Sequence, residues 1–267
     1  MLMNDWPVLD ERAAGHARFD VLRELTRRAD AGDEAPIIVE GAEAVRWLLT
    51  SSLSVELVIG KPSVLRALEA ELGARRDLRC YQADQPAMQQ LLGFAFTRGV
   101  IAVGRRPSPL PLSDLASHAR RLVLTDAVHD PSNIGAIIRS ARCLGLDGLV
   151  CGPGCADPWY RRSVRVSVGH VCHLPHAQVA DLAAAVGALR AQGWSVYAAH
   201  RGPASVPIAA IEAQEPWAVV LGNEDRGVSG EVVAACNAAF TIPVADGVDS
   251  LNVAVAAGVA FYALASR

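Results

Sequence analysis

The sequence predicts an α/β protein built around a mainly parallel sheet. Short apolar runs that are typical of buried strands alternate with segments of helical periodicity along most of the chain. Such repeated strand–helix–strand units pair their strands in parallel, because each crossover helix returns the chain to the same end of the sheet. Two late strands also run into loops of Gly and small polar residues, where an open α/β sheet places a small ligand. We expect a cofactor site there.

The composition is that of a globular protein without a membrane segment. The chain has 267 residues, of which 51% are hydrophobic and only 5% aromatic, so it can bury one large or two modest cores made mostly of Ala, Val and Leu. No apolar run reaches the roughly 20 residues that span a bilayer. The N-terminus lacks the basic start and apolar middle of a signal peptide. We therefore expect a cytoplasmic protein with no membrane partner.

A first, small α/β domain is predicted over residues 1–104. Its expected helices are residues 11–30, 41–50, 62–72 and 85–92, and its expected strands are residues 36–39, 55–59, 79–82 and 100–103. Pro62 suits the first turn of a helix, because its φ is fixed and its missing N–H is not needed there. The segment RRPSPLPL, residues 105–112, has prolines at three alternate positions and is predicted to be a semi-rigid linker.

A second domain is predicted over residues 113–267. Its expected helices are residues 114–118, 132–144, a short basic one at 158–166, 179–192, a short one after the Gly227 turn, and a last one that opens at 250–252. Its expected strands are residues 122–124, 149–151, 195–199, 218–221 and 241–244. Gly145 and Gly193 each follow a predicted helix, where Gly commonly ends one.

The distribution of charge indicates that nucleic acid could bind only at local clusters of arginine. The net charge of −3 argues against indiscriminate binding of polyanions, yet the positive charge is almost all arginine, with Lys61 the only lysine. Guanidinium groups suit bidentate phosphate contacts, and local patches can bind RNA on a mildly acidic protein. Several arginines occur in pairs, among them Arg161 and Arg162 with Arg165 close by. Solvated helix faces are the alternative for any single pair.

The six cysteines do not form a disulfide framework in a chain of this length. The pattern nearest to a metal site consists of Cys151, Cys155, His170, Cys172, His173 and His176. Zinc ligands usually pair at tighter, repeated spacings. The alternation in VCHLPH instead favours a strand with one exposed face. We expect no metal.

Three polar blocks carry the candidate chemistry. In NIGAIIR, residues 133–139, the apolar residues share one helix face and Arg139 lies on the opposite side, with Gly135 one turn earlier leaving room for its side chain or a ligand. An ordinary exposed arginine is the alternative. In GNEDRG, residues 222–227, Gly lets the main chain approach a ligand closely. There, a polar turn in which Glu224 caps the next helix is the alternative.

The third block runs from Pro243 to Val253 and contains Ser250-Leu-Asn. The alternative here is that Ser250 or Asp249 is only an N-cap. The helix that follows, NVAVAAGVAFYALA, is small and apolar on nearly every side, which indicates burial or close packing against another helix. A homodimer interface is a natural use for it.

The order and spacing of these blocks resemble the three motifs of the SpoU family of RNA ribose 2′-O-methyltransferases, within the knotted SPOUT superfamily. DPSNIGAIIRSA is similar to the first motif, LGNEDRG to the second, and IPV with SLNV to the third, over roughly residues 120–265. The N-terminal domain, with IIVEGAEAVRWLL, more loosely resembles a ribosomal-protein-like substrate-binding domain. Two positions depart from the family pattern, Asp246 where Gly is frequent and Ala254 where Ser is usual.

The resemblance implies a homodimer that uses S-adenosylmethionine to methylate a ribose 2′-hydroxyl in structured RNA, with a C-terminal trefoil knot. The implied catalytic residues are Asn133, Arg139, Glu224, Ser250 and Asn252. The implied cofactor-binding residues are Ala199, Leu221, Gly222, Asn223, Gly227, Ile242, Pro243, Ser250, Leu251 and Val253. The expected RNA-binding residues are Arg139, Arg161, Arg162 and Arg165. Because a guanidinium stays protonated at neutral pH, we expect Arg139 to bind phosphate or stabilise the developing alkoxide, with proton abstraction as the secondary role.

Other enzyme classes fit less well. No G-x-G-x-x-G follows a predicted strand, which disfavours a nicotinamide-dependent dehydrogenase, and no G-x-S-x-G elbow supports a serine hydrolase. Three alternatives stay open: a tRNA instead of an rRNA substrate, methylation of a base nitrogen, and a non-catalytic RNA-binding relative. We favour rRNA, because an accessory N-terminal domain precedes the catalytic one.

Overall fold

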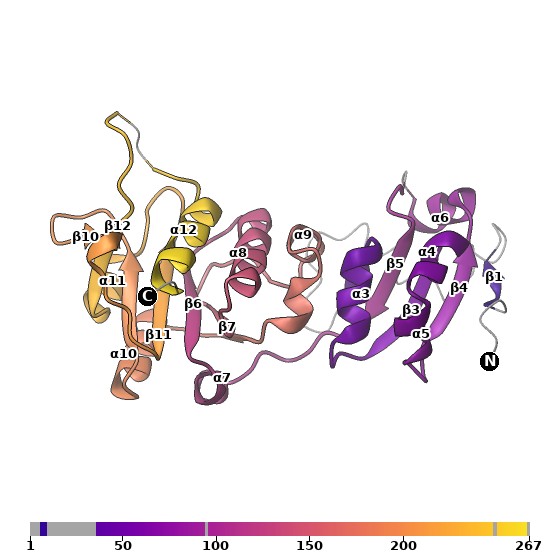
Figure 1. Ribbon diagram of the computed structural model, residues 1–267, viewed down its shortest axis with the longest axis horizontal. Coiled ribbons are helices and arrows are strands. Elements are labelled where there is room, and N and C mark those ends of the chain that lie inside the picture. The colour runs from indigo at the N-terminus through magenta and orange to yellow at the C-terminus, as the bar shows by residue number, and fades with distance from the viewer. Residues whose placement is uncertain (1–5, 10–35, 94–95, 248–249, 266–267) are drawn as a thin grey trace. The chain divides into compact units, whose positions relative to one another are not determined.

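The computed structural model describes residues 6–9, 36–93, 96–247 and 250–265 (Figure 1). The predicted helix over residues 11–30 lies outside these ranges. By its contacts the chain divides into two compact units: Met1–Ser108 with Trp159–His173, and Pro109–Pro158 with Leu174–Arg267. The sequence-based prediction places residues 159–173 in the second domain, whereas they pack with the first unit. In the described residues, no helix is long and apolar enough to cross a membrane.

The first unit contains a five-stranded mixed sheet in the order β1-β4-β3-β5-β2. Its strands are β1 (Val8–Leu9), β2 (Ile37–Glu40), β3 (Val55–Gly60), β4 (Arg79–Ala83) and β5 (Val100–Gly104). Strands β1, β4 and β3 are parallel neighbours, and β5 runs antiparallel to both β3 and β2. Apolar side chains of these strands form a core with α6.

The helices that connect these strands are α3 (Ala42–Thr50), α4 (Pro62–Ala67), α5 (Glu69–Gly73) and α6 (Gln85–Leu92). The predicted helix at residues 62–72 is therefore two short helices, which meet at Leu68, whose ψ of 14° leaves the helical range. Helix α6 matches its prediction because both of its ends are specified locally. The Asp84 side chain accepts a hydrogen bond from the Ala87 N–H (2.9 Å), and Gly93 ends the helix with a left-handed backbone.

The second unit contains a seven-stranded sheet in the order β10-β12-β9-β11-β6-β7-β8, and its described strand pairs are all parallel. This confirms the mainly parallel sheet. The strands are β6 (Arg121–Asp126), β7 (Gly148–Cys151), β8 (His176–Gln178), β9 (Ser195–Ala199), β10 (Val206–Pro207), β11 (Trp217–Gly222) and β12 (Ala238–Thr241). The edge strands β8 and β10 have only two or three residues, too few to give a periodic signal.

Helices cover both faces of this sheet (Figure 1). They are α7 (Leu112–His118), α8 (Pro131–Cys143), α10 (Leu182–Ala191), η3 (Ile208–Ala210), α11 (Gly230–Ala235) and α12 (Val253–Ala265). Leu122 and Leu124 of β6 pack in one core with α7, α10 and α11. Side chains alternate along a strand, so Val123 faces the other layer, where α8 and α12 lie side by side.

Two predicted strands differ from the structure. Residues 241–244 were expected to be a strand, but β12 ends at Thr241, because Pro243 has no N–H to continue the ladder. Residues 171–176 do not alternate as a strand. They begin inside a 3₁₀ helix, η2 (His170–His173), which follows Gly169 at a φ of 81°. That part of the sequence prediction was wrong.

Candidate cofactor and catalytic site

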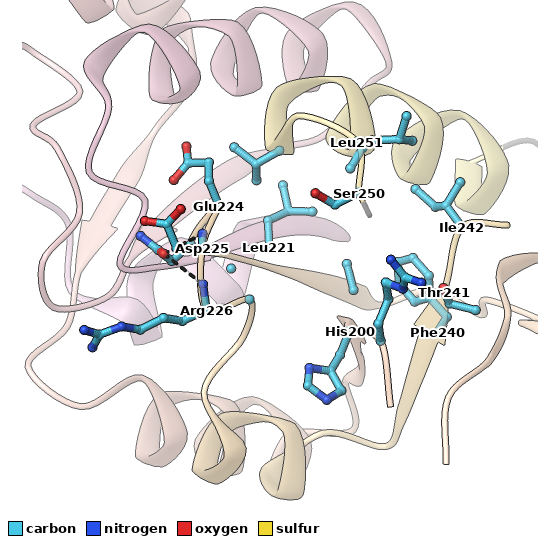
Figure 2. Close-up of a pocket in the computed structure, with 17 residues that line it drawn as sticks. His200, Leu221, Glu224, Asp225, Arg226, Phe240, Thr241, Ile242, Ser250 and Leu251 are labelled. Carbon is cyan, nitrogen blue, oxygen red and sulfur yellow. Dashed lines mark hydrogen bonds between the residues drawn. The ribbon is translucent and has the colours of Figure 1, made fainter. Parts of the chain in front are cut away.

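A pocket opens at the carboxyl ends of the neighbouring strands β9, β11 and β12. Its volume is about 510 Å³, within the usual range for small-molecule sites. Figure 2 shows Glu224 and Asp225 on one side of it and Phe240, Thr241 and Ile242 on the other. Its lining residues are Ala199, His200, Arg201, Leu221, Gly222, Asn223, Glu224, Asp225, Arg226, Gly227, Phe240, Thr241, Ile242, Ser250, Leu251, Val253 and Ala256.

The turn after β11 closes one side of this pocket, and its shape requires glycine. A Cβ at Gly222 would lie 2.1 Å from the carbonyl carbon of Gly227 and 2.2 Å from the Val228 nitrogen, which no side chain can occupy. The Asn223 and Gly227 backbones exchange two hydrogen bonds of 2.8 and 3.1 Å. Gly227 has a φ of 69°, which glycine adopts without strain. The main chain itself therefore forms this pocket wall.

Asn223 holds the turn in place. Its Oδ1 accepts hydrogen bonds from the backbone N–H groups of Asp225 (2.9 Å) and Arg226 (3.1 Å), and its Nδ2 donates to the carbonyl oxygen of Ala127 (3.0 Å). Ala127 follows β6, the strand next to β11. Asn223 thus ties the second polar block to the loop that precedes the first block.

The three polar blocks are joined by side-chain hydrogen bonds. Asn133 of α8 is buried and donates through Nδ2 to Oε1 of Glu224. Its Oδ1 accepts from Nδ2 of Asn252 at 3.1 Å. Asn252 also begins α12, because its own Oδ1 accepts from the Ala254 N–H at 2.9 Å. Asn133 is therefore a hub that fixes one residue from each of the other two blocks.

These hydrogen bonds show whether Glu224 and Ser250 cap helices, which was the alternative interpretation of their two blocks. Glu224 does not cap α11, whose N-cap is Ser229; it bonds to Asn133 instead. Ser250 does not cap α12, since the capping oxygen belongs to Asn252, and Ser250 lines the pocket. Asp249 lies outside the described residues.

The predicted cofactor-binding residues line the pocket, with the exception of Pro243. Sequence reasoning missed seven lining residues: His200, Arg201, Asp225, Arg226, Phe240, Thr241 and Ala256. Most of them follow or end a strand, so the rule that ligands bind outside the carboxyl ends of strands could have found them.

Arg139 lies outside this pocket within one chain. It is exposed, and six residues separate it from Asn133, which is about 9 Å of rise and roughly a third of a turn around the α8 axis. The part of the chain that the structure describes gives its guanidinium no hydrogen-bond or ion-pair partner. The expectation that Arg139 lies opposite the apolar face of α8 is confirmed.

The three arginines after Tyr160 belong to the first unit, on α9 (Arg161–Val166). Arg162 and Arg165 are exposed. Arg161 instead forms an ion pair with the buried carboxylate of Glu40. Only two of these three predicted RNA-binding residues are therefore open to a phosphate.

Five of the six cysteines are held as neutral thiols by burial. Burial raises the pKa of Cys151 and of Cys155, and it raises the pKa of Cys80, Cys172 and Cys236 to about 12. The thiolate is the form that ligates metals and attacks electrophiles, so these groups suit neither role at neutral pH. Within the described ranges, no group of three or more His, Cys, Asp or Glu side chains could hold a metal ion.

We expect alkaline pH to destabilise the protein through these buried thiols. Unfolded thiols have a pKa near 9.0, below the values in the folded protein, so their contribution is complete below about pH 9 and is lost as the pH rises toward 12. Urea titrations should show the free energy of unfolding falling by about 2 kcal/mol or more between pH 8 and 10.5. Cys236→Ala should reduce this slope and Cys143→Ala, at an exposed site, should not. Equal slopes in the two variants would contradict the assignment.

A parallel sheet with a pocket at its carboxyl edge, walled by main chain, defines an α/β protein that binds a small-molecule cofactor. Residues 120–262 match the model of the SpoU rRNA Methylase family, and the chain belongs to that family. It is 35% identical over 250 residues to an uncharacterised tRNA/rRNA methyltransferase of Mycobacterium tuberculosis, covering 91% of this chain and 86% of the relative.

Two further comparisons concern activity and cofactor. The chain is 30% identical over 229 residues to the 23S rRNA (guanosine(2553)-2′-O)-methyltransferase RlmP of Bacillus subtilis, covering 85% of this chain and 87% of that protein. It superposes with a TM-score of 0.79 and 25% identity on an AdoMet-bound rRNA methyltransferase from Sinorhizobium meliloti, covering 93% and 94% of the two chains. The protein is thus an RNA methyltransferase that uses S-adenosylmethionine.

Proposed function

We propose that the protein methylates a ribose 2′-hydroxyl of ribosomal RNA at the pocket of the second unit. The observation that carries this proposal is the network Glu224–Asn133–Asn252, which joins the three polar blocks through Glu224, a residue of the pocket wall. The naming of the Bacillus subtilis relative as a 2′-O-methyltransferase of 23S rRNA supports ribose as the acceptor and rRNA as the substrate.

The pocket fits S-adenosylmethionine by its chemistry. Leu221, Ile242 and Leu251 supply apolar surface for a flat purine, while the turn at Gly222 and Gly227 offers main-chain groups for hydrogen bonds. When bound, the cofactor supplies an activated methyl group on a cationic sulfonium. The carboxylate of Glu224 places a negative charge on the wall of the same pocket, and a nearby carboxylate favours a cation.

The chain's own residues have to align the acceptor and manage one proton, because the leaving group is already good. Asn133 holds the Glu224 carboxylate and the Asn252 amide in fixed positions, so the polar edge of the site is preorganised before RNA arrives. Ser250 is exposed in the pocket and offers a hydroxyl beside them. We assign these four residues to orienting the acceptor ribose.

The exposed face of α12 supports a homodimer. Its outward residues are apolar and recur at helical spacing: Val255, Val259 and Tyr262. Val255 is 53% and Tyr262 66% exposed, which is unusual for a row of large apolar groups. A second copy that presents the same helix would cover both rows at once, as a two-fold interface does.

The homodimer would also bring Arg139 into a site. Helix α8 packs directly beside α12, with Ser140 against Gly258, so the neighbouring Arg139 borders the face that a second copy covers. Since Arg139 does not line its own chain's pocket, we propose that it serves the pocket of the partner copy. We also propose that the segment from β12 to α12 forms a trefoil knot. The first unit, in turn, would select the RNA, as a ribosomal-protein-like domain does.

Calorimetric titration with S-adenosylmethionine and S-adenosylhomocysteine tests the pocket assignment. Saturable binding at one site per chain is expected, and it should be weakened by a substitution in the pocket such as Leu251→Glu, which puts a carboxylate on its apolar wall. Binding that Leu251→Glu leaves unchanged would contradict the assignment of this pocket.

Arg139→Lys should separate two roles of the guanidinium. If Arg139 binds a phosphate or the developing alkoxide, lysine keeps the charge, so activity persists while RNA affinity falls by about tenfold with the loss of the bidentate contact. If Arg139 is the base, the pH–rate profile instead shifts, because lysine has a pKa of about 10.4. We expect weaker RNA binding and an unshifted profile; a shifted profile would reject the phosphate role.

A further inference from the structure

Residues Trp159–His173 form an excursion that leaves the second unit after Pro158 and returns to it at Leu174. Between these points the chain packs on the first unit, with α9 against β2 and η2 against α3. The excursion therefore adds two covalent connections between the units, at Pro158–Trp159 and at His173–Leu174, to the one at Ser108–Pro109. The contacts between the excursion and the first unit therefore set the positions of its exposed arginines, Arg162 and Arg165.

One anchor lies at the start of the excursion. The Arg161 Nε–H donates to Oε1 of Glu40, whose side chain is only 5% exposed. Among the described residues, Arg98 is a second cation near this carboxylate, with its Nε 4.0 Å from Oε2. Glu40 is the last residue of β2, where its backbone is fixed by pairing with Ile101 of β5. A buried carboxylate on a rigid strand is costly unless it is paired, and the guanidinium of Arg161 is its closer partner, since it donates a hydrogen bond to the carboxylate.

A second anchor lies at the end of the excursion. Nε2 of His173 lies 2.8 Å from the carbonyl oxygen of Trp47, and the two rings meet edge to face with centroids 5.2 Å apart. Between the anchors, Gly169 approaches the backbone of α3 so closely that a Cβ would lie 2.7 Å from the carbonyl oxygen of Ala44. The excursion is thus fitted to the first unit along its length.

Helix α9 cannot keep its orientation without these contacts. It has six residues and no side-chain N-cap, and so short a helix is unstable on its own in water. Arg161 points to Glu40, Val164 is fully buried, and Arg162 and Arg165 share the exposed face. The ion pair and the exposed arginines are therefore parts of one small rigid element.

We propose that Glu40 is a positioning residue for RNA binding: through Arg161 it fixes α9, so that Arg162 and Arg165 meet the phosphates of the RNA in a defined place. This inference rests on the proposed function, because it takes RNA as the partner. It gives the first unit a direct part in RNA recognition without requiring Glu40 or Arg161 to touch RNA. The two adjacent arginines then have different roles, Arg161 inward and Arg162 outward.

The test is Glu40→Gln in the full-length protein, with Glu56→Gln as the matched control. Glu56 pairs with Arg105 at 3.6 Å on the surface of the same unit, where both side chains are exposed.

The measurements are affinity for total ribosomal RNA at several salt concentrations, the concentration of that RNA at half-maximal methylation, S-adenosylmethionine affinity, and amide hydrogen exchange in α9. We expect Glu40→Gln to weaken RNA binding about tenfold, as the loss of one or two phosphate contacts does. Exchange in α9 should be faster and cofactor affinity unchanged.

A second variant keeps the inference testable if Glu40→Gln folds poorly. The pair Glu40→Gln with Arg161→Met removes both charges, so neither is left unpaired, and buried pairs often tolerate such replacement. It should restore the slow exchange of α9 and the RNA affinity, which a direct Arg161–phosphate contact would not allow. If the double variant folds and protects α9 but binds RNA as weakly as Glu40→Gln, Arg161 itself contacts RNA and the inference is overturned.

Arg162→Ala with Arg165→Ala separates this inference from the proposed function. It should weaken RNA binding as Glu40→Gln does and flatten the salt dependence, while α9 exchange stays slow. If it weakens RNA binding and Glu40→Gln does not, the positioning role of Glu40 is wrong and the proposed function stands. If the unaltered protein transfers no methyl group to ribose in RNA, the proposed function fails, and α9 exchange in Glu40→Gln still decides whether Glu40 holds the helix.

Discussion

Gly222→Ala should abolish cofactor binding. The added Cβ would lie 2.1 to 2.4 Å from three backbone atoms of Gly227 and Val228, and backbone cannot rotate away as a side chain can. The turn would have to leave the end of β11, which breaks the Asn223–Gly227 pair and the main-chain wall of the pocket. We expect a loss of about 3 kcal/mol in the free energy of unfolding, at the upper end for overpacking, and a loss of about 100-fold or more in S-adenosylmethionine affinity.

Gly230→Ala is the matched control for this prediction. Gly230 is the first residue of α11, and a Cβ there would have no atom within 4 Å. Alanine also costs less backbone entropy than glycine in a helix, so this variant should fold at least as well and bind the cofactor normally. The readouts are calorimetry for affinity and urea unfolding for stability. If Gly222→Ala binds S-adenosylmethionine as Gly230→Ala does, the turn does not form the cofactor wall.

Co-assembled variants should reveal whether Arg139 acts across the proposed dimer. Arg139→Ala and Glu224→Ala homodimers should each lose about 10³-fold in rate, the size expected when one preorganised polar group of an active site is removed. If Arg139 serves the partner's pocket, a heterodimer of these two chains contains one site with both groups intact and one site with neither. Purified through two different tags, it should recover about half of the unaltered activity, because a two-fold dimer has two equal sites.

The heterodimer experiment gives a different result if Arg139 acts within its own chain. If Arg139 acts on the pocket of its own chain, every site in the heterodimer lacks one group, and activity stays at the level of the single variants. Tyr262→Ala offers a control, because it leaves the pocket intact but removes the most exposed large apolar side chain of α12. It should weaken association and lower activity at low protein concentration only.

Local signals predicted much of the architecture. The alternation of apolar runs with helical periods indicated most elements of both units, because this signal acts within a few residues. Strand ends rich in Gly also indicated the pocket. The predicted strand at residues 241–244 lies too late in the chain, because the apolar Ile242 was counted as part of the strand although Pro243 has no N–H for the ladder.

The contacts that build the site could not be predicted from periodicity. Asn133 meets Glu224 across 91 residues and Asn252 across 119, and Arg161 meets Glu40 across 121. A polar side chain in a short segment gives no indication of which distant residue will bond to it. The resemblance to SpoU motifs named Asn133, Glu224 and Asn252, but only the structure shows that they form one hydrogen-bonded network and that Arg139 is outside it.

The position of the transferred methyl group tests the central claim most directly. The protein would be incubated with total ribosomal RNA from cells that lack it and with S-adenosylmethionine labelled on the methyl group, and the RNA then hydrolysed in alkali. A 2′-O-methyl group blocks cleavage at its own phosphodiester, so the account predicts that the label appears in alkali-resistant dinucleotides, and that Asn133→Ala abolishes it. Label recovered in mononucleotides would place the methyl group on a base and contradict the account.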